Sequence, residues 1–336
     1  MVQVAMQDGL VIGIDIGGTK VAAGLVDGNA EIRYQTRSPM VPDSDAAAGL
    51  AAVISAIDSL SASFPNGGVH NLIHGIGICS PGPLDPATGI VINPPNLPCW
   101  RNFPLATKIS QIYSVPVKVD NDANGAALAE AQWGAGRGYR NVFYTTIGTG
   151  IGTGIVLDGR IYHGRTGAAA EGGHLSIDYR GPRCRCGKRG CIEVLASGPA
   201  IAKRAQARLM TLQGLTSVIL DLAEGNIEAV TSEMVDKASA AGDPVAKEIL
   251  QETIEFLSLW LGNIVDLLEP DVMIIGGGVA SMLNPFFDEI RNRLSGYCIN
   301  SRCQEIPLLR ARYGVDSGIL GGASIAASNI VAVGKR

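Results

Sequence analysis

The chain has 336 residues, 46% of them hydrophobic and 17% charged, and its net charge at pH 7 is −4. This composition is typical of a globular protein with room for two domains, and it excludes a disordered or fibrous chain. The small negative charge gives no general attraction to nucleic acid or to an anionic membrane, so neither is expected as a partner. No segment is suited to a signal peptide or a membrane span, and we therefore expect a cytoplasmic protein.

The first third of the chain reads as a β-meander followed by alternating helix and strand segments. Short apolar runs bounded by Gly-Gly and Asp-Gly turns are typical of antiparallel strands, and apolar residues at helical spacing predict a covering helix. The predicted elements are strands at 10–16, 20–26, 31–36, 72–79 and 115–120 and a helix at 45–63.

The same meander recurs from residue 141, where NVFYTTIGTGIGTGIVLDGRIYHG gives a strand, a Gly/Thr-rich turn, a second strand and another Asp-Gly turn. Two copies of one plan predict an ancient duplication rather than a short-period repeat. The remaining predicted elements are helices at 198–211, 214–223, 244–266 and 285–295, a strand at 272–277 and a final helix.

Alternating strands and helices predict two α/β domains, each with a mixed sheet covered by helices. We place a smaller N-terminal domain at 1–120 and a larger C-terminal domain at 121–321. The final helix, at about 322–336, is expected to pack back on the first domain.

The turn after the first strand has residues suited to phosphate binding. It contains Asp15, Gly17, Gly18, Thr19 and Lys20 and lies between two strands, so it is neither a Walker A loop nor a dinucleotide fingerprint. Backbone N–H groups at such a turn can still bind phosphate oxygens. Asp15 is suited to hold Mg²⁺ through water. Taken alone, the turn is more often a plain tight hairpin.

The equivalent turn of the second copy strengthens the phosphate interpretation. It contains Gly148, Thr149 and Gly150, and two such hairpins facing each other across a cleft would clamp a triphosphate from both sides. A further glycine run, Gly276-Gly277-Gly278, ends a buried strand just before a helix, where a nucleobase or ribose can pack against bare backbone.

Carboxylates cluster where the predicted strand at 115–120 ends. Asp120, Asn121, Asp122 and Asn124 follow it in the segment VDNDAN. Two functions compete here, because Asp and Asn are good helix caps and because Asp122 is also placed to act as a general base toward an attacking hydroxyl.

Three cysteines in the segment CRCGKRGC suggest a metal clip. Cys184, Cys186 and Cys191 leave a tetrahedral zinc one ligand short, and His174 lies ten residues upstream of the first of them. The alternatives are a metal-free thiol cluster and, less favoured in a reducing compartment, a disulfide. We favour a structural Zn²⁺ that fixes the nearby acidic residues Glu171 and Glu193 and thereby shapes a substrate pocket.

Six motifs occur in one order at compatible spacings: DIGGTK, SPGPLDPATG, VDNDANGAALAE, IGTGIGTG, AEGGH and CRCGKRGCIE. Together they resemble the ROK family (repressors, open reading frames, kinases) over nearly the whole chain. The chain is most similar to bacterial ATP-dependent glucokinases. The resemblance implies a two-domain actin/hexokinase-like (ribonuclease-H-like) α/β fold, with duplicated mixed sheets flanking a cleft.

The resemblance also implies a function and its residues. The activity is ATP-dependent phosphorylation of glucose to glucose 6-phosphate, with Mg²⁺, and the family commonly forms a homodimer or a dimer of dimers. Asp122 matches the catalytic base. The remaining positions that match sugar contacts are Gly82, Asn96, Asn121, Glu171, His174 and Glu193, with His174 also on zinc.

Two positions depart from the family pattern, and other functions stay open. Cys99 stands where glycine is expected, and Thr153 interrupts a turn that is often richer in glycine. The alternatives are a kinase for fructose, allose or an N-acetylhexosamine, and a non-catalytic ROK sugar sensor. A DNA-binding repressor is disfavoured, because only nine residues precede Leu10, too few for a DNA-reading module.

Overall fold

The computed structural model describes residues 9–63, 72–211 and 216–333. Contacts between residues divide the chain into two compact units. Unit 1 consists of Met1–Asn141, Gly154–Ala170 and Arg312–Arg336, and unit 2 consists of Val142–Thr153 and Glu171–Ala311. Both units are therefore discontinuous in sequence, because the chain leaves and re-enters each of them.

The sheet of unit 1 is mixed and has the strand order β3-β2-β1-β4-β7. Its strands are β1 (Leu10–Ile16), β2 (Lys20–Val26), β3 (Ile32–Pro39), β4 (Ile73–Ser80) and β7 (Val117–Asn121), and a small hairpin is formed by β5 (Leu84–Asp85) and β6 (Ile90–Val91). The first three strands are antiparallel, whereas β4 and β7 continue the sheet parallel to β1. The predicted meander and the two buried strands are confirmed.

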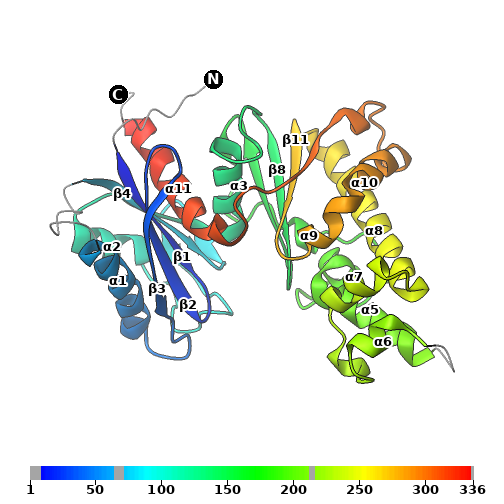
Figure 1. Ribbon diagram of the computed structural model, residues 1–336. Helices are drawn as coiled ribbons and strands as arrows, with labels where there is room; N and C mark the ends of the chain where they lie inside the picture. Colours follow the sequence, from blue (N-terminus) through cyan, green and yellow to red (C-terminus); the bar gives the residue numbers. More distant parts are fainter. Residues whose placement is uncertain (1–8, 64–71, 212–215, 334–336) are drawn as a thin grey trace. The chain divides into compact units, whose positions relative to one another are not determined.

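Helices cover both faces of this sheet (Figure 1). They are α1 (Ala46–Ala62), α2 (Leu105–Tyr113), α3 (Asp122–Gln132) and α11 (Ser317–Val333). Alternation along β1 separates the two cores, because Ile12 and Ile14 pack with α1 and α2 while Val11 packs with α3 and α11. Strands β1, β4 and β7 are parallel, so their carboxyl ends lie at the same edge of the sheet. Helix α3 starts at this edge, directly after β7.

Helix α11 packs directly on the backbone of the sheet. A Cβ atom on Gly13 would lie 1.9 Å from the carbonyl oxygen of Ile319, and one on Gly77 would lie 1.9 Å from that of Gly322. The helix begins at Ser317 and not near 322 as predicted, because the glycines that look like a loop in the sequence are helical contact points. Residues 334–336 of the predicted helix lie outside the described residues.

The second sheet repeats the plan of the first, with the order β10-β9-β8-β11-β12. Its strands are β8 (Val142–Ile147), β9 (Ile151–Leu157), β10 (Arg160–Ile161), β11 (Val272–Gly276) and β12 (Leu308–Arg310). Strands β8, β11 and β12 are parallel, as are β1, β4 and β7. The predicted duplication of a mixed sheet is thus confirmed. The division between the units falls within β9, after Thr153.

Unit 2 is rich in helices. They are α4 (Glu193–Ala196), α5 (Gly198–Thr211), α6 (Val218–Leu222), α7 (Ser232–Ala240), α8 (Pro244–Leu268), α9 (Ala280–Leu283) and α10 (Phe287–Arg293). Single 3₁₀ turns are η3 (Gly172–His174), η4 (Ile227–Ala229), η5 (Asn284–Phe286), η6 (Leu294–Gly296), η7 (Cys303–Glu305) and η8 (Gly314–Asp316), the last in unit 1. On α8, Trp260 packs edge-on against Phe143 of β8 in the core.

Two predicted helices of this unit need correction. The prediction at 285–295 is interrupted, since 3₁₀ turns flank a short α10. The prediction at 214–223 reduces to α6, which Ser217 caps with its side chain, and residues 214 and 215 lie outside the described residues. Among the helices of the described part, none combines the length and apolar character needed to cross a membrane.

Candidate active site and metal centre

A cluster of carboxylates forms where β1 and β7 end. The register of the sheet aligns Asp15 of β1 with Cys79 of β4, and Cys79 with Asp120 of β7. Burial and then the negative charge of Asp122 raise the pKa of Asp15, whereas Lys20 lowers it. The structure therefore brings the predicted magnesium residue and the predicted base close enough to interact electrostatically.

Asp122 is the first residue of α3, and it is not the cap of that helix. The cap is Asn121, whose side-chain oxygen accepts a hydrogen bond from the backbone N–H of Ala123 at 2.9 Å. Asp122 keeps access to solvent, yet the surrounding protein displaces water and raises its pKa, an effect that hydrogen bonds from the backbone and from Asn121 partly offset. The N–H of Ala123 also donates to Oδ1 of Asp122 at 2.8 Å, so Asn121 and Asp122 share this donor, and Oδ2 is the carboxylate oxygen of Asp122 left for chemistry.

Further predicted site residues of unit 1 gather around this cluster. A Cβ atom on Gly82 would lie 3.7 Å from the side-chain nitrogen of Asn121. One on Gly18 would lie 3.1 Å from the carbonyl oxygen of Asn96, so the first hairpin approaches that loop closely. The exposed residues Thr19 and Lys20 complete the hairpin.

Helix α11 begins beside the same carboxylates. A Cβ atom on Gly318 would lie 2.5 Å from Oδ2 of Asp15, so the helix start and the carboxylate are in direct contact. The positive end of the helix dipole favours a negative charge at that place.

Asp120 and His163 support the junction between β7 and α3. The Asp120 carboxylate is 4% exposed and accepts hydrogen bonds from the backbone N–H of Asn121 and from the side-chain amide of Asn124. Its second oxygen lies 2.6 Å from Nε2 of His163, which follows β10. A pairing over such a sequence separation has no signature in the sequence, although the acidic run itself marks the region.

The second predicted phosphate hairpin, between β8 and β9, is fixed within unit 2 by backbone bonds. The N–H of Gly148 donates to the carbonyl of Gly150 at 2.9 Å, and the N–H of Gly198 donates to the carbonyl of Gly148 at 2.9 Å. A Cβ atom on Gly277 would lie 2.3 Å from the Ile147 carbonyl oxygen. The structure thus brings the hairpin and the glycine run at 276–278 together, as a nucleotide site requires.

The hairpin also holds the predicted sugar-binding segments of unit 2. Oε2 of Glu193 accepts a hydrogen bond from the backbone N–H of Ile151 at 3.0 Å. The hydroxyl of Thr153 accepts one from the N–H of Gly172 at 2.8 Å, and the indole of Trp260 donates to the Gly172 carbonyl at 3.1 Å. Thr153, which departs from the family pattern, therefore anchors the 3₁₀ turn that carries His174.

Glu171 and His174 flank this anchored turn. Glu171 is exposed at its N-terminal side, and His174 is partly buried at its end. The predicted sugar contacts are consequently divided between the units, with Gly82, Asn96, Asn121 and Asp122 in unit 1 and Glu171, His174 and Glu193 in unit 2.

One ligand atom from each of His174, Cys184, Cys186 and Cys191 converges on a single point. These atoms all lie within 4.8 Å of one another. The Sγ atoms of Cys186 and Cys191 are 3.6 Å apart, as are Sγ of Cys184 and Nδ1 of His174. A zinc tetrahedron with bonds of about 2.3 Å has S–S edges of about 3.8 Å, so the donor set fits zinc.

Local backbone geometry explains why the clip closes. Gly187 and Gly190 both have positive φ, and a Cβ atom on Gly190 would lie 1.7 Å from the carbonyl oxygen of Asp178. The N–H of Cys184 donates to the carbonyl of Lys188 at 2.8 Å, which closes the tight turn. Burial and the neighbouring thiols raise the pKa of Cys191 to about 12, and a cation bound by the cluster would favour its thiolate form.

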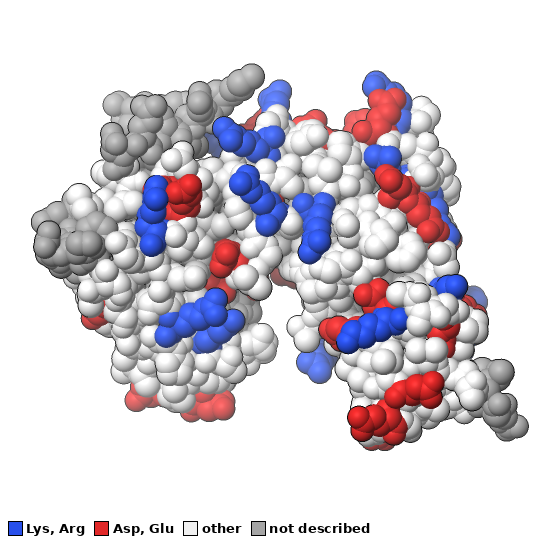
Figure 2. All heavy atoms as spheres, in the orientation of Figure 1, with Lys and Arg blue, Asp and Glu red and all other residues white. Residues whose placement is uncertain are grey.

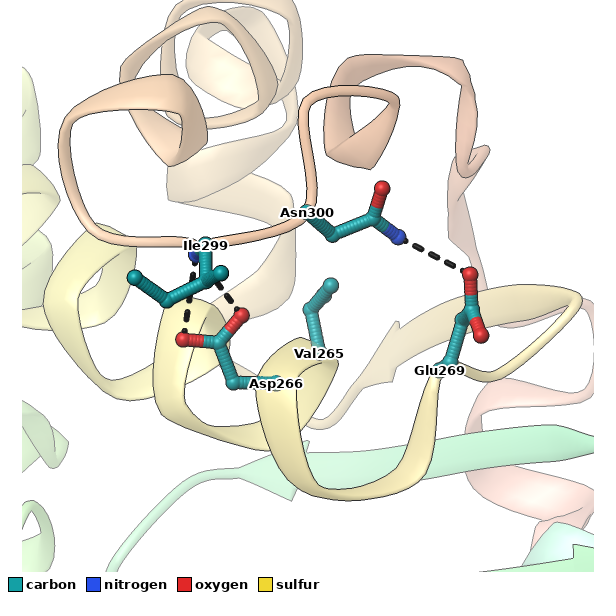
Figure 3. A pocket seen from close by; sticks show the side chains of 5 residues that line it. All are labelled: Val265, Asp266, Glu269, Ile299 and Asn300. Carbon is teal, nitrogen blue, oxygen red and sulfur yellow. Dashed lines mark hydrogen bonds between the residues drawn. The ribbon is translucent and has the colours of Figure 1, made fainter.

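One further surface hollow is formed by residues to which the sequence assigns no role. A hollow at the end of α8 is lined by Val265, Asp266, Glu269, Ile299 and Asn300, and it contains no predicted site residue (Figure 3). Its polar groups are satisfied internally, because Asp266 accepts from the N–H of Ile299 and Glu269 from the side chain of Asn300. Basic and acidic side chains are interspersed on the visible face of each unit (Figure 2).

Comparisons with known proteins identify a family and several relatives of this chain. The sequence pattern of the ROK family matches residues 11–329. Glucokinase from Streptomyces coelicolor is 32% identical over 321 residues, which cover 95% of this chain and 98% of that protein. Glucokinase from Thermotoga maritima is 33% identical, with coverages of 94% and 96%. A crystal structure of a ROK family glucokinase from Streptomyces griseus in complex with glucose and AMPPNP matches with a TM-score of 0.77 at 33% identity, covering 95% of this chain and 100% of that one.

Proposed function

Because this chain belongs to the ROK family, we propose that it is an ATP-dependent kinase that phosphorylates glucose to glucose 6-phosphate. Its α/β fold with two mixed sheets is the actin/hexokinase-like fold of ROK glucokinases, as the sequence predicts. Sugar kinases of this family transfer a phosphoryl group to an alcohol, and the residues proposed for this step are divided between the two units.

The observation that carries the proposal is the setting of Asp122. This carboxylate stands at the first position of α3, beside Asp15 and next to the capping residue Asn121. In phosphoryl transfer, little covalent chemistry is required of the protein beyond positioning, charge neutralisation and a base for the attacking hydroxyl. Asp122 is proposed to accept the proton of the sugar 6-hydroxyl as its oxygen attacks the γ-phosphorus of ATP.

The nucleotide is proposed to bind at the glycine-rich segments. Backbone N–H groups of the hairpins at 17–20 and 148–150 would contact its phosphates, and the run at 276–278 would pack against its nucleoside. Asp15 would hold Mg²⁺ through water, and this ion would neutralise charge on the phosphates. Lys20, which is exposed beside Asp15, adds a further positive charge.

The sugar is proposed to be recognised by polar groups whose positions are fixed by other contacts. Gly82, Asn96 and Asn121 in unit 1 and Glu171, His174 and Glu193 in unit 2 are the proposed contacts. Sites that match each hydroxyl reject analogues strongly, because a missing hydroxyl leaves a polar group of the site unpaired. Nδ1 of His174 faces Cys184, which leaves Nε2 for a hydroxyl.

The four clip residues are proposed to bind a structural Zn²⁺. Four donors leave no open coordination position for water, which favours a structural over a catalytic ion. The ion would fix the segment from His174 to Cys191, and Glu193 follows two residues later at the start of α4. The proposed location is the cytoplasm, and the proposed assembly is a homo-oligomer, which size-exclusion chromatography with light scattering would test.

The decisive experiment for the activity is an ADP-release assay with Mg-ATP and a panel of sugars. The panel consists of glucose, fructose, mannose, allose, N-acetylglucosamine and N-acetylmannosamine. The highest kcat/KM is expected with glucose. A higher value with another hexose would keep the kinase and change its substrate, whereas no turnover with any of them would contradict the proposal and favour a sugar sensor.

The role of the base is tested by Asp122→Asn. General-base catalysis typically contributes about 10²- to 10⁴-fold, so kcat is expected to fall by that factor. Glucose binding, measured by calorimetry, is expected to stay within a few-fold, because the amide keeps most polar contacts. A kcat within tenfold of wild type would show that Asp122 is not the base.

A further inference from the structure

The Asp120 carboxylate, two residues before the proposed base, collects hydrogen bonds from three parts of unit 1. Oδ1 accepts from the backbone N–H of Asn121 at 2.7 Å and from Nδ2 of Asn124 at 3.0 Å. Oδ2 faces Nε2 of His163 at 2.6 Å. A buried carboxylate is costly unless its oxygens are bonded and its charge is paired, so the stability of this junction depends on each of these partners.

Two of the three hydrogen bonds to Asp120 hold the junction between β7 and α3, which carries Asn121 and Asp122. The bond to the Asn121 N–H fixes the backbone where β7 ends, and the bond to Asn124 fixes the first turn of α3. Asn121 and Asp122 lie between these two points. Any rotation of the Asp120 carboxylate would therefore shift the backbone that aims the proposed base.

His163 supplies the third bond and the charge. The hydrogen bond that the imidazole makes to the Asp120 carboxylate raises the pKa of His163, which favours the cationic form and hence an ion pair with Asp120. An N–O separation of 2.6 Å is typical of a charge-assisted hydrogen bond, which is about twice as strong as a neutral one. The charge that acts electrostatically on the imidazole ring is that of Asp120.

The backbone around His163 is itself held in place. The N–H of Tyr162 donates to the carbonyl of Ile155 at 2.8 Å, and the N–H of Ala169 donates to the carbonyl of His163 at 3.2 Å. Its side chain is 35% exposed, and Asp120 is almost fully buried. The imidazole thus reaches from a fixed surface segment to a carboxylate under the proposed active site.

We propose that His163 is a positioning residue for phosphoryl transfer, which holds Asn121 and Asp122 in the reactive geometry by pairing with Asp120. This inference rests on the proposed role of Asp122 as the base. His163 itself makes no contact with substrate in this scheme. Misplacing a reacting group by about 1 Å can cost about 100-fold in rate, so the loss of this support is expected in kcat.

The test compares His163→Ala and His163→Gln with the control His74→Ala. Gln places its amide nitrogen where histidine has Nε2, so it can still donate to Asp120, whereas Ala cannot. His74 is an exposed histidine on β4 outside the proposed site. Kinetic constants for sugar and ATP and the thermal midpoint are measured for each protein.

His163→Ala is expected to lower kcat by about 10- to 100-fold with KM for ATP within about threefold. His163→Gln is expected to recover most of that loss, and His74→Ala to match wild type. A kcat of His163→Ala within twofold of wild type would overturn the proposal. Equal losses in the Ala and Gln variants would overturn it as well, since a hydrogen-bond donor at this position is what the proposal requires.

Asp122→Asn, assayed in parallel, separates this inference from the proposed function. If Asp122→Asn loses turnover while His163→Ala keeps it, the base stands and the positioning role fails. If Asp122→Asn keeps turnover, the base assignment fails first, and with it the geometry that His163 was inferred to support. Should His163→Ala give little folded protein, His163→Leu takes its place in the comparison with Gln, because leucine fills more of the imidazole volume and cannot donate a hydrogen bond to Asp120.

Discussion

At Asp122 the protein keeps a carboxylate in surroundings that disfavour its charge. The surrounding protein displaces water from this carboxylate and raises its pKa, and the charge of Asp122 in turn raises the pKa of Asp15. Groups of this kind are retained at functional sites although they lower the stability of the fold. Asp120 differs in its surroundings, because His163 lies against its carboxylate.

The stability of Asp122→Asn is expected to exceed that of wild type at pH 8. A carboxyl group whose pKa is raised by folding destabilises the native state above that pKa and not below the unfolded value near 3.9. The gain in thermal midpoint should therefore shrink as the pH falls through the raised pKa. Thermal melts between pH 4.5 and pH 8 measure this, and a lower midpoint of the variant at pH 8 would contradict it.

Single residues were predictable from sequence where the signal is local. The run VDNDAN marked the region of the proposed base, and the structure then identified Asn121 as the N-cap of α3. The pairing of Asp120 with His163 was not predictable, since 43 residues separate them and neither sits in a recognisable spacing. Side-chain contacts of this kind depend on tertiary packing, which a local sequence motif does not predict.

The β8–β9 hairpin shows how one element serves two proposed subsites. Its turn carries the proposed phosphate-binding glycines, while Ile151 and Thr153 on its second strand bond to Glu193 and Gly172. The proposed ATP-binding and sugar-binding segments of unit 2 are thus joined by hydrogen bonds. A change in one is expected to be felt in the other.

Thr153→Val should show this coupling. The substitution keeps the volume and removes the acceptor for the Gly172 N–H, and leaving a buried donor unsatisfied costs about 1–3 kcal/mol. We expect kcat/KM for the sugar to fall by about tenfold, because the turn that carries His174 loosens.

The matched control is Thr145→Val. Thr145 is a buried threonine of β8 whose hydroxyl donates to the carbonyl of Gly152. It should lose stability without a comparable loss of kcat/KM. Similar kinetic losses in both variants would argue against a specific role of Thr153.

The sequence predicted helices and strands correctly where a segment is long and has a regular apolar pattern. It failed where tertiary contacts determine whether a helix forms or where it starts. The start of α11 was placed too late because Gly318, Gly321 and Gly322 disfavour a helix by about 1 kcal/mol each. Packing on bare strand backbone outweighs that preference. The short helices α2 and α7 were not predicted, since nine residues give little helical periodicity.

For the whole molecule, the division into two units predicts that a change in one unit can lower the stability of that unit more than the stability of the other. The proposed zinc clip lies within unit 2, and the carboxylate cluster lies within unit 1. Structural zinc contributes folding energy directly to the part of the chain that binds it. Its loss should therefore affect one unit more than the other.

Removal of zinc by chelation, or Cys186→Ser, is expected to lower the thermal midpoint of unit 2 by about 5 °C or more. Hydrogen exchange should accelerate between His174 and Cys191, whereas β1 and β4 of unit 1 should keep their protection. Cys298→Ser, a cysteine of the same unit outside the cluster, is the control. Unchanged exchange in a protein shown to be zinc-free would contradict a structural role of the ion.

The packing of α11 on bare strand backbone has a consequence for synthesis on the ribosome. The strands of unit 1 emerge early, but Val11, Ala22 and Val26 stay uncovered until the helix that begins at Ser317 is translated. At about 5–20 residues per second, the stretch between β7 and α11 takes roughly 10–40 s to make. During that interval the nascent chain presents an apolar strand face that chaperones can bind. A stop codon before Ser317 would leave that face uncovered for good, and such truncated chains are expected to aggregate.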